Sequence, residues 1–190
     1  MFGLVQIFDE IINNAKEHTF RDPSCNKIKI NINKNTGEIS CWNNGNKSIP
    51  IEMHKKENKY IPELIFYSSK LLDKKFYEKI KIDELSGYGA KLTNRFSKRF
   101  YIEVNDSNKK LKYRQHFYDN MFNHDSPIIT HSHNEDSYVN VIFTPDYLEW
   151  GFIGLSEPVI KEFSQKVYDI VNSVSDHVKI YLNDELIINI

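Results

Sequence analysis

Four segments between residues 99 and 144 are rich in β-branched and aromatic residues and are joined by short polar turns. They are 99–106, 110–118, 127–132 and 138–144. Such a series is typical of neighbouring antiparallel strands. Earlier strands are predicted at 27–33 and 38–42 around an "NTG" turn, and a last pair at 177–184 and 186–190.

Helices are predicted between these strands. The spacing of apolar residues predicts helices at 7–18, 60–72 and 156–173, and "GYGAKLTNRFS" (87–97) is predicted to be a Gly-rich turn that runs into a helix. Residues 73–86 are charged and poorly periodic, which predicts a loop or lid. The sequence therefore predicts an α+β fold, a two-layer sandwich with helices on one face of a mixed, mostly antiparallel sheet.

Composition limits the class of protein. The chain has 190 residues, 40% of them hydrophobic and 27% charged, which favours a single globular domain over residues 1–190. The formal net charge of −1 provides no global basic field that would attract nucleic acid, and the basic runs at 54–59 and 108–112 are interpreted as solvated turns. No apolar run is long enough to span a membrane, and Cys25 and Cys41 lack metal or redox spacing.

Three segments combine residues that suit phosphate chemistry. In "IFDEIINNAKEH" (7–18), Glu10 and Asn14 are four residues apart and share a helix face. The others are "WNNG" (42–45), at a strand end, and "SGYGAKL" (86–92), at a predicted helix start. Backbone N–H groups at a helix start can bind phosphate, an Asn oxygen suits Mg²⁺, and a Glu can polarise water that attacks a γ-phosphate.

These segments, in this order, resemble the nucleotide-binding domain of eukaryotic and viral type IIA DNA topoisomerases, which belongs to the ATPase superfamily of gyrase, Hsp90, histidine kinases and MutL. "IFDEIINNA" is similar to the first motif of that family, "WNNG" to the second and "GYGAKLTNRFS" to the third. The similarity extends through "RQHFYDNM" (114–121), "VIFTPD" (141–146) and "VKIYLND" (178–184), so it covers nearly the whole chain.

The resemblance implies a nucleotide pocket under a lid, with ATP and Mg²⁺ as cofactors. It implies that Glu10 is the general base for hydrolysis, that Asn14 coordinates Mg²⁺ and that Asn43 faces the adenine. It implies a phosphate-binding segment made of Ser86, Gly87, Tyr88, Gly89, Ala90 and Lys91.

This chain differs from the family pattern at several positions. Asp83 and Glu84 replace two glycines, His18 replaces a second nucleotide-facing asparagine, and Ser48 stands where a glycine is expected. The leading hypothesis is an ATP-binding and ATP-hydrolysing domain that gates DNA strand passage in a type II topoisomerase. The differences leave an alternative open, a non-catalytic nucleotide-binding or interaction module. A protein kinase or chaperone of the superfamily ranks below both.

Further expectations concern the rest of such an enzyme. The sequence contains neither the N-terminal strap nor the transducer and DNA-cleavage regions of the family, so DNA is expected to be reached only through other regions or a companion subunit. The full enzyme is expected to be a homodimer, whereas the isolated chain is expected to be a monomer with weak or no turnover. A nuclear location is expected in a eukaryote, and otherwise an intracellular one.

Two other hypotheses start from single segments. "HDSPIITHSHNED" (124–136) contains His131 and His133, which could bind Zn²⁺ from one side of a strand, although a polar loop is favoured. Tyr113, Phe117 and Tyr118 could stack on bases, but their alternation on a strand favours core packing.

Overall fold

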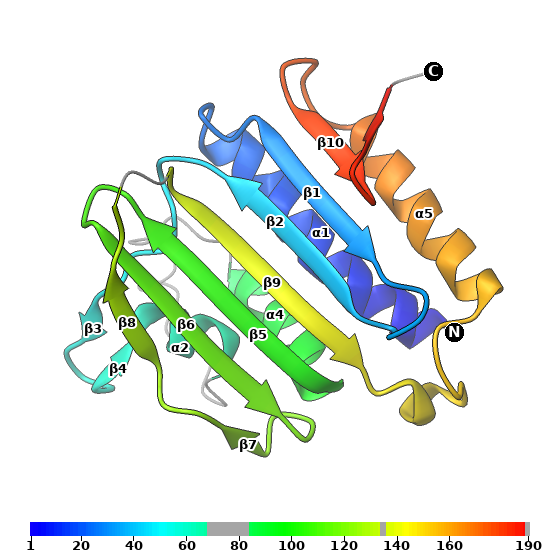
Figure 1. Ribbon diagram of the computed structural model, residues 1–190, viewed down its shortest axis with the longest axis horizontal. Coiled ribbons are helices and arrows are strands. Elements are labelled where there is room, and N and C mark those ends of the chain that lie inside the picture. Colours follow the sequence, from blue (N-terminus) through cyan, green and yellow to red (C-terminus); the bar gives the residue numbers. More distant parts are fainter. Residues whose placement is uncertain (68–83, 134–135, 189–190) are drawn as a thin grey trace.

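The computed structural model describes residues 1–67, 84–133 and 136–188, and it has the predicted α+β architecture (Figure 1). Within the described residues one sheet has nine strands in the order β11-β10-β1-β2-β9-β5-β6-β7, and β8 also pairs with β6. The strands are β1 (Lys27–Ile32), β2 (Ile39–Asn44), β5 (Ser97–Asp106), β6 (Leu111–Tyr118), β7 (Asn123–His124), β8 (Ile128–His131), β9 (Tyr138–Pro145), β10 (Lys179–Leu182) and β11 (Glu185–Ile187).

The sheet is mixed and mostly antiparallel, as predicted. β1 pairs in parallel with β10, whereas the other recorded pairings in this sheet are antiparallel. Side chains along β1, β2, β6 and β9 alternate between buried and partly exposed positions. The alternation means that the sheet has one face in the core and a second face that is not part of it.

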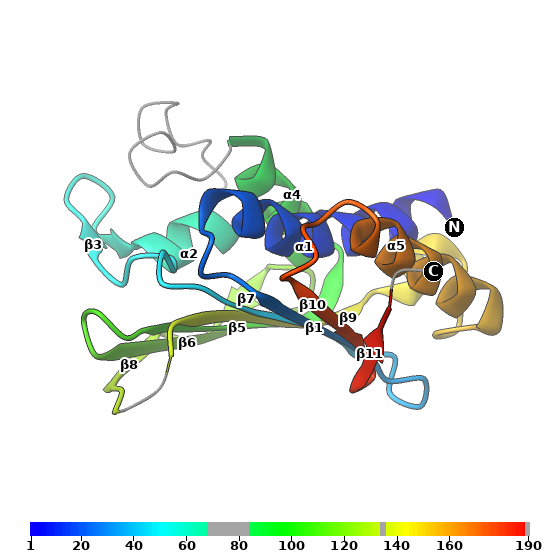
Figure 2. The ribbon, with the colours of Figure 1, turned by 90° about the horizontal axis from the view of Figure 1, so that it is seen from above.

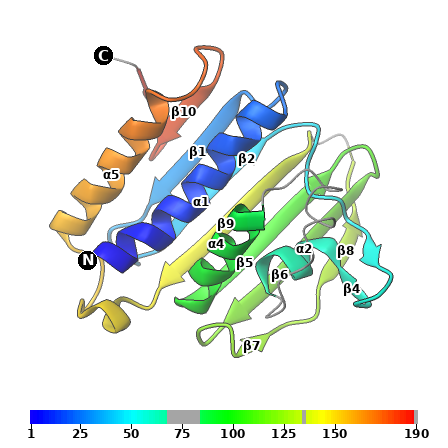
Figure 3. The ribbon, with the colours of Figure 1, turned by 180° about the vertical axis from the view of Figure 1, so that it is seen from behind.

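The helices lie together on one side of the sheet (Figures 2 and 3). They are α1 (Phe2–Arg21), α2 (Ile61–Phe66), α4 (Glu84–Arg95) and α5 (Glu157–Val171), with a 3₁₀ turn, η1 (Tyr147–Trp150). A short separate hairpin consists of β3 (Met53–His54) and β4 (Lys59–Tyr60). The core fills the space between the helices and the inner face of the sheet, where Phe8 of α1 stacks on Phe163 of α5 with ring centroids 4.2 Å apart.

The predictions at 60–72 and 87–97 differ most from the structure. α4 begins at Glu84, so the predicted Gly-rich turn at 87–89 is wrong, since these residues are helical. The reason is tertiary packing, because Gly89 and Thr93 lie on the α4 face that contacts α1. Of the predicted helix at 60–72, the structure describes α2, and residues 68–83 of the predicted helix end and loop lie outside the described residues.

Some smaller features also bear on the sequence predictions. Lys55 and Lys56 of the basic run are exposed in the β3–β4 turn, as expected for a solvated turn. Tyr113 and Phe117 are buried in the core, which confirms core packing, whereas Tyr118 is partly exposed. In the described parts of the chain, no helix combines the length and apolarity needed to cross a membrane.

Candidate functional site

One face of α1 carries three polar residues in a line. Glu10, Asn14 and His18 are spaced by four, so they share a face and extend over about 12 Å of the helix axis. Glu10 and Asn14 are partly buried and His18 is buried. The line meets a different element at each end, α4 at Glu10 and the end of β2 at His18.

At the Glu10 end, α1 and α4 are in close contact. A Cβ atom on Gly89 would lie 2.0 Å from Glu10 Oε2, so a side chain at this position would displace the carboxylate. The Thr93 hydroxyl donates to the carbonyl oxygen of Ile7 at 2.9 Å, across 86 positions of the chain. Gln6 Nε2 donates to Glu10 Oε1 at 2.6 Å. The first and third sequence motifs therefore meet, and the carboxylate is oriented by its own helix.

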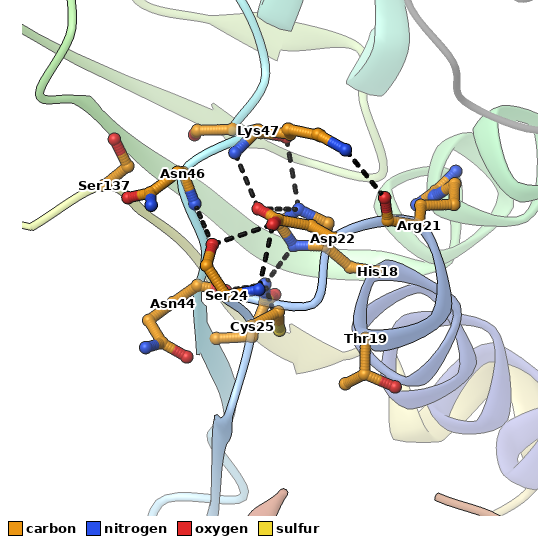
Figure 4. Close-up of polar contacts among 12 residues, drawn as sticks. His18, Thr19, Arg21, Asp22, Ser24, Cys25, Asn44, Asn46, Lys47 and Ser137 are labelled. Carbon is orange, nitrogen blue, oxygen red and sulfur yellow. Dashed lines mark hydrogen bonds and ion pairs between the residues drawn. The ribbon is translucent and has the colours of Figure 1, made fainter. Parts of the chain in front are cut away.

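At the other end, His18 contacts Asn43, which is buried near the end of β2. Asn43 Nδ2 lies 2.7 Å from His18 Nδ1 and also donates to the carbonyl oxygen of Asn44 at 3.2 Å. Because an amide nitrogen is a donor, His18 Nδ1 is the acceptor and the ring hydrogen is on Nε2. That nitrogen lies 3.1 Å from the carbonyl oxygen of Lys47, to which it donates (Figure 4).

Asp22 connects the end of α1 to the loop after β2 (Figure 4). Its Oδ2 accepts the backbone N–H of Lys47 at 2.7 Å, and its Oδ1 accepts both the backbone N–H and the hydroxyl of Ser24 at 3.0 and 2.7 Å. The Ser24 hydroxyl accepts the backbone N–H of Asn46 at 2.8 Å. Gly45, at φ 143°, lies close to the Asp22 carboxylate and has no side chain to clash with it. A Cβ at this position would lie 2.9 Å from Asp22 Oδ2.

The charge states of this cluster follow from burial and hydrogen bonding. Burial, with Arg21 nearby, lowers the pKa of His18 in spite of Asp22 and the Lys47 carbonyl, which both act to raise it. Burial would raise the pKa of Asp22, but the hydrogen bonds from Lys47 and Ser24 outweigh it and hold this pKa below its ordinary value. A neutral His18 and an ionised Asp22 are therefore the favoured forms.

The lowered pKa of His18 predicts a stability that depends on pH. Below the ordinary value of 6.5 the unfolded chain binds a proton that the folded chain resists, so the free energy of unfolding should fall as pH drops from 6.5 towards the lower, folded pKa. Urea unfolding at several values from about pH 7.5 to pH 5 should show this slope, and His18→Gln should reduce it. A slope that is the same in both proteins would assign the effect to another group.

Several of the predicted site residues lie on α4. Tyr88 is exposed and Ala90 is buried. Lys91 is buried, which lowers its pKa, and it lies about 200° around the helix from Gly89. Its placement in the nucleotide site therefore stays a prediction.

Ser86 and Gly87 lie in α4, within its first four described residues. The glycines at 87 and 89 are both helical, and a role of this segment in phosphate binding stays a prediction.

The contacts that hold these residues were not predicted from the sequence. His18 was noted as a replaced asparagine, but its bond to Asn43 was not predicted, nor were the roles of Thr93, Asp22 and Ser24. The "RDPSC" segment after α1 did carry a signal, since an Asp two residues before a Ser is typical of an Asx turn.

A zinc site receives no support from the described residues, which contain no group of three or more potential metal ligands. His131 and His133 are both exposed, with ring centroids 6.4 Å apart. A polar segment remains the interpretation of 124–136.

A mostly antiparallel sheet with its helices on one face, and a Glu- and Asn-bearing helix packed against a Gly-containing one, define an ATP-binding sandwich of the gyrase and Hsp90 type. Comparison with known proteins agrees. The chain belongs to the histidine kinase-, DNA gyrase B-, and HSP90-like ATPase family, whose model matches residues 2–126.

Individual relatives are more specific. The chain is 42% identical over 184 residues to DNA topoisomerase 2 of Saccharomyces cerevisiae, covering 95% of this chain and 13% of that protein. It is 37% identical over 189 residues to DNA topoisomerase 2 of Acanthamoeba polyphaga mimivirus, covering 98% of this chain and 14% of that protein. The chain therefore spans about one seventh of the length of such relatives.

Solved structures confirm the fold. The ATPase region of S. cerevisiae topoisomerase II superposes with a TM-score of 0.87 at 39% identity, over 97% of this chain and 48% of that one. The 43K ATPase domain of Thermus thermophilus gyrase B, at 18% identity and a TM-score of 0.69, shares the fold. The predicted resemblance to the ATPase domain of type II topoisomerases is thus confirmed.

Proposed function

We propose that this domain binds ATP with Mg²⁺ along the polar face of α1 and hydrolyses it to gate DNA strand passage within a type II topoisomerase. The observation that carries the proposal is the pair of contacts at the two ends of this face, Glu10 with Gly89 of α4 and His18 with Asn43 of β2. Through these contacts the second motif, on β2, and the third motif, on α4, lie at opposite ends of the polar face of α1, which carries the first motif.

The two ends of the face differ in chemistry. At the α4 end, the carboxylate of Glu10 is the general base for the attacking water, and the first-turn N–H groups of α4 bind phosphate. At the β2 end, Asn43 contacts the adenine. Asn14 lies between them and offers a hard oxygen to Mg²⁺, which neutralises charge on the triphosphate. A single protein oxygen fits this ion, because Mg²⁺ with nucleotides keeps most of its ligands as phosphate and water.

The larger assembly follows from the proposed enzyme. DNA is cleaved and passed by other regions of the enzyme or by a companion subunit, and two copies of the enzyme form the gate. Residues 1–190 form one domain of it, nuclear in a eukaryotic cell. The comparisons give no support to the alternative of a non-catalytic module.

The proposal predicts a preference for ATP over GTP. Asn43 Nδ2 is committed to His18 and Asn44, so the Asn43 carbonyl oxygen is the group that can accept from an amino-purine. GTP presents an oxygen at that position, and an unpaired buried acceptor costs about 1–3 kcal/mol, roughly a 5- to 150-fold loss of affinity. Competition of ATP and GTP for a fluorescent nucleotide measures the ratio.

His18→Ala should reduce this preference, because the Asn43 amide then loses the acceptor that fixes its orientation. Asn172→Ala, an exposed change after α5, is the matched control and should leave the ratio unchanged. Equal affinities for ATP and GTP in the unmodified protein would show that Asn43 does not read the base.

A further inference from the structure

The face of the sheet opposite the helices carries a strong positive charge. No helix of the described residues covers this face, which is turned towards the viewer in Figure 1 and lies below the helices in Figure 2. Its strand positions include a single acidic residue, Glu103, and six basic ones. The basic ones are Lys27, Lys29, Arg99, Lys112, Arg114 and Lys179. The net charge of the chain is −1, but basic side chains outnumber acidic ones on this face of the sheet.

Sheet register places these residues on one surface. Lys29, Trp42, Asn140, Glu103 and Arg114 are consecutive cross-strand neighbours from β1 to β6. Four strand steps separate β1 from β6, about 19 Å at the usual strand spacing. Basic residues on β1 and β10 and others on β5 and β6 therefore border a central strip.

The central strip is aromatic and is covered by two of the lysines. Lys29 Nζ lies 5.5 Å from the Trp42 ring centroid, and Lys112 Nζ lies 5.7 Å from that of Tyr138. The Trp42 and Tyr138 rings are 5.8 Å apart. The lysine stems thus lie over rings while their charged ends stay at the surface.

The single carboxylate on the strands of this face is bound by two tyrosine hydroxyls. Glu103 accepts hydrogen bonds from the hydroxyls of Tyr138 and Tyr101, at 2.7 and 3.2 Å. Among the described residues, no ion pair involves Lys27, Lys29, Arg99, Arg114 or Lys179. A second carboxylate, Asp125, accepts a hydrogen bond from the hydroxyl of Tyr118 at 3.2 Å, at the β7 edge of this surface.

We infer that this face binds the phosphate backbone of duplex DNA. Its spread of lysines and arginines and its half-buried aromatics suit a polyanion more than an apolar protein layer. Its basic borders are far enough apart to face both backbones across a major groove of about 12 Å. The choice of DNA rests on the proposed function, whereas the preference for a polyanion does not. Binding is independent of sequence and weakens with salt.

Anisotropy of a labelled duplex of about 20 base pairs, titrated at several salt concentrations, tests this inference. The unmodified protein should bind with a dissociation constant of roughly 10⁻⁴–10⁻⁶ M. Up to six phosphate contacts would make the logarithm of the binding constant fall with the logarithm of the salt concentration, with a slope no steeper than about −5. Lys29→Gln with Arg114→Gln should make that slope about 2 units shallower and weaken binding tenfold or more at about 0.1 M salt.

Matched variants complete the design. Arg99→Gln with Lys179→Gln should give the same loss, and serves if the first pair destabilises the sheet, because both residues are exposed. Lys56→Gln with Lys161→Gln removes the same charge from exposed sites on the helical side and should leave binding within about twofold. Equal losses in this control would overturn the inference, as would tighter binding of a polyglutamate peptide or a single-stranded RNA.

Nucleotide binding, measured on the same proteins, separates the two proposals. The face variants should bind Mg·ATP normally, and Asn43→Ala should bind duplex normally. No duplex binding beside normal Mg·ATP binding overturns this inference alone, whereas duplex binding without Mg·ATP binding overturns the proposed function.

Discussion

Glu10→Gln is expected to lower ATP hydrolysis by roughly 10²–10⁴-fold, because the amide cannot accept the proton of the attacking water. Nucleotide affinity should change little, since binding depends on Asn14, Asn43 and the amides at the start of α4. The structure supports a preserved fold in this variant, because Gln is isosteric and can keep the contact with Gln6. Single-turnover hydrolysis, with protein in excess over labelled ATP, measures the loss even where turnover is slow.

Asp9→Asn is the matched control for Glu10→Gln. Asp9 is the neighbouring carboxylate on α1, but it faces α5, where Lys166 Nζ lies 3.4 Å away. Its amide variant should keep hydrolysis within about twofold, since a partly exposed ion pair contributes little. Similar rates for Glu10→Gln and the unmodified protein, with contaminating ATPase excluded, would assign the base elsewhere.

Gly89→Ala is expected to separate stability from hydrolysis. In the middle of a helix, alanine is favoured over glycine by about 1 kcal/mol, which offsets the cost of moving a flexible side chain. The moved side chain is Glu10, because the new methyl group would occupy the position 2.0 Å from its Oε2. The free energy of unfolding should therefore change by less than about 1 kcal/mol, while hydrolysis falls about 10²-fold or more because the base is displaced.

Urea unfolding and the same single-turnover assay measure the two effects. Gly154→Ala is the control, because a Cβ at this position has no atom within 4 Å and should affect neither quantity. Normal hydrolysis in Gly89→Ala would show that the position of the Glu10 carboxylate in the structure is not the catalytic one. Severe destabilisation would show that the contact between α1 and α4 cannot adjust.

Much of the fold could be predicted because its signals are local. The alternation in residues 99–144 gave the antiparallel strands β5, β6, β8 and β9, and the apolar spacing of 7–18 lies within α1. The parallel pairing of β1 with β10 was not predicted, since nothing near Lys27 in sequence points to Lys179. Pairings between distant segments depend on the assembled layers, which a single local pattern does not contain.

In the candidate site, too, local features could be predicted from the sequence, whereas contacts between distant segments could not. Glu10 and Asn14 followed from helix spacing and from motif resemblance, and the structure places Glu10 against Gly89 as the motif order suggested. The error at 87–89 arose because glycine favours turns locally, whereas packing of Gly89 and Thr93 on α1 stabilises a helix. The hydrogen bond between His18 and Asn43 could not be predicted from the sequence. It joins residues 25 positions apart, on α1 and β2, and depends on how the helix packs on the sheet.

Calorimetric titration of the 190-residue chain with Mg²⁺ and a non-hydrolysable ATP analogue tests the central claim most directly. We predict saturable binding of one nucleotide per chain, reduced at least tenfold in Asn14→Ala and in Asn43→Ala, about the effect of losing one buried hydrogen bond at each end of the nucleotide. Removing Mg²⁺ should weaken the unmodified protein and leave Asn14→Ala nearly unaffected. Binding that both variants retain in full would place the nucleotide away from α1 and contradict the account.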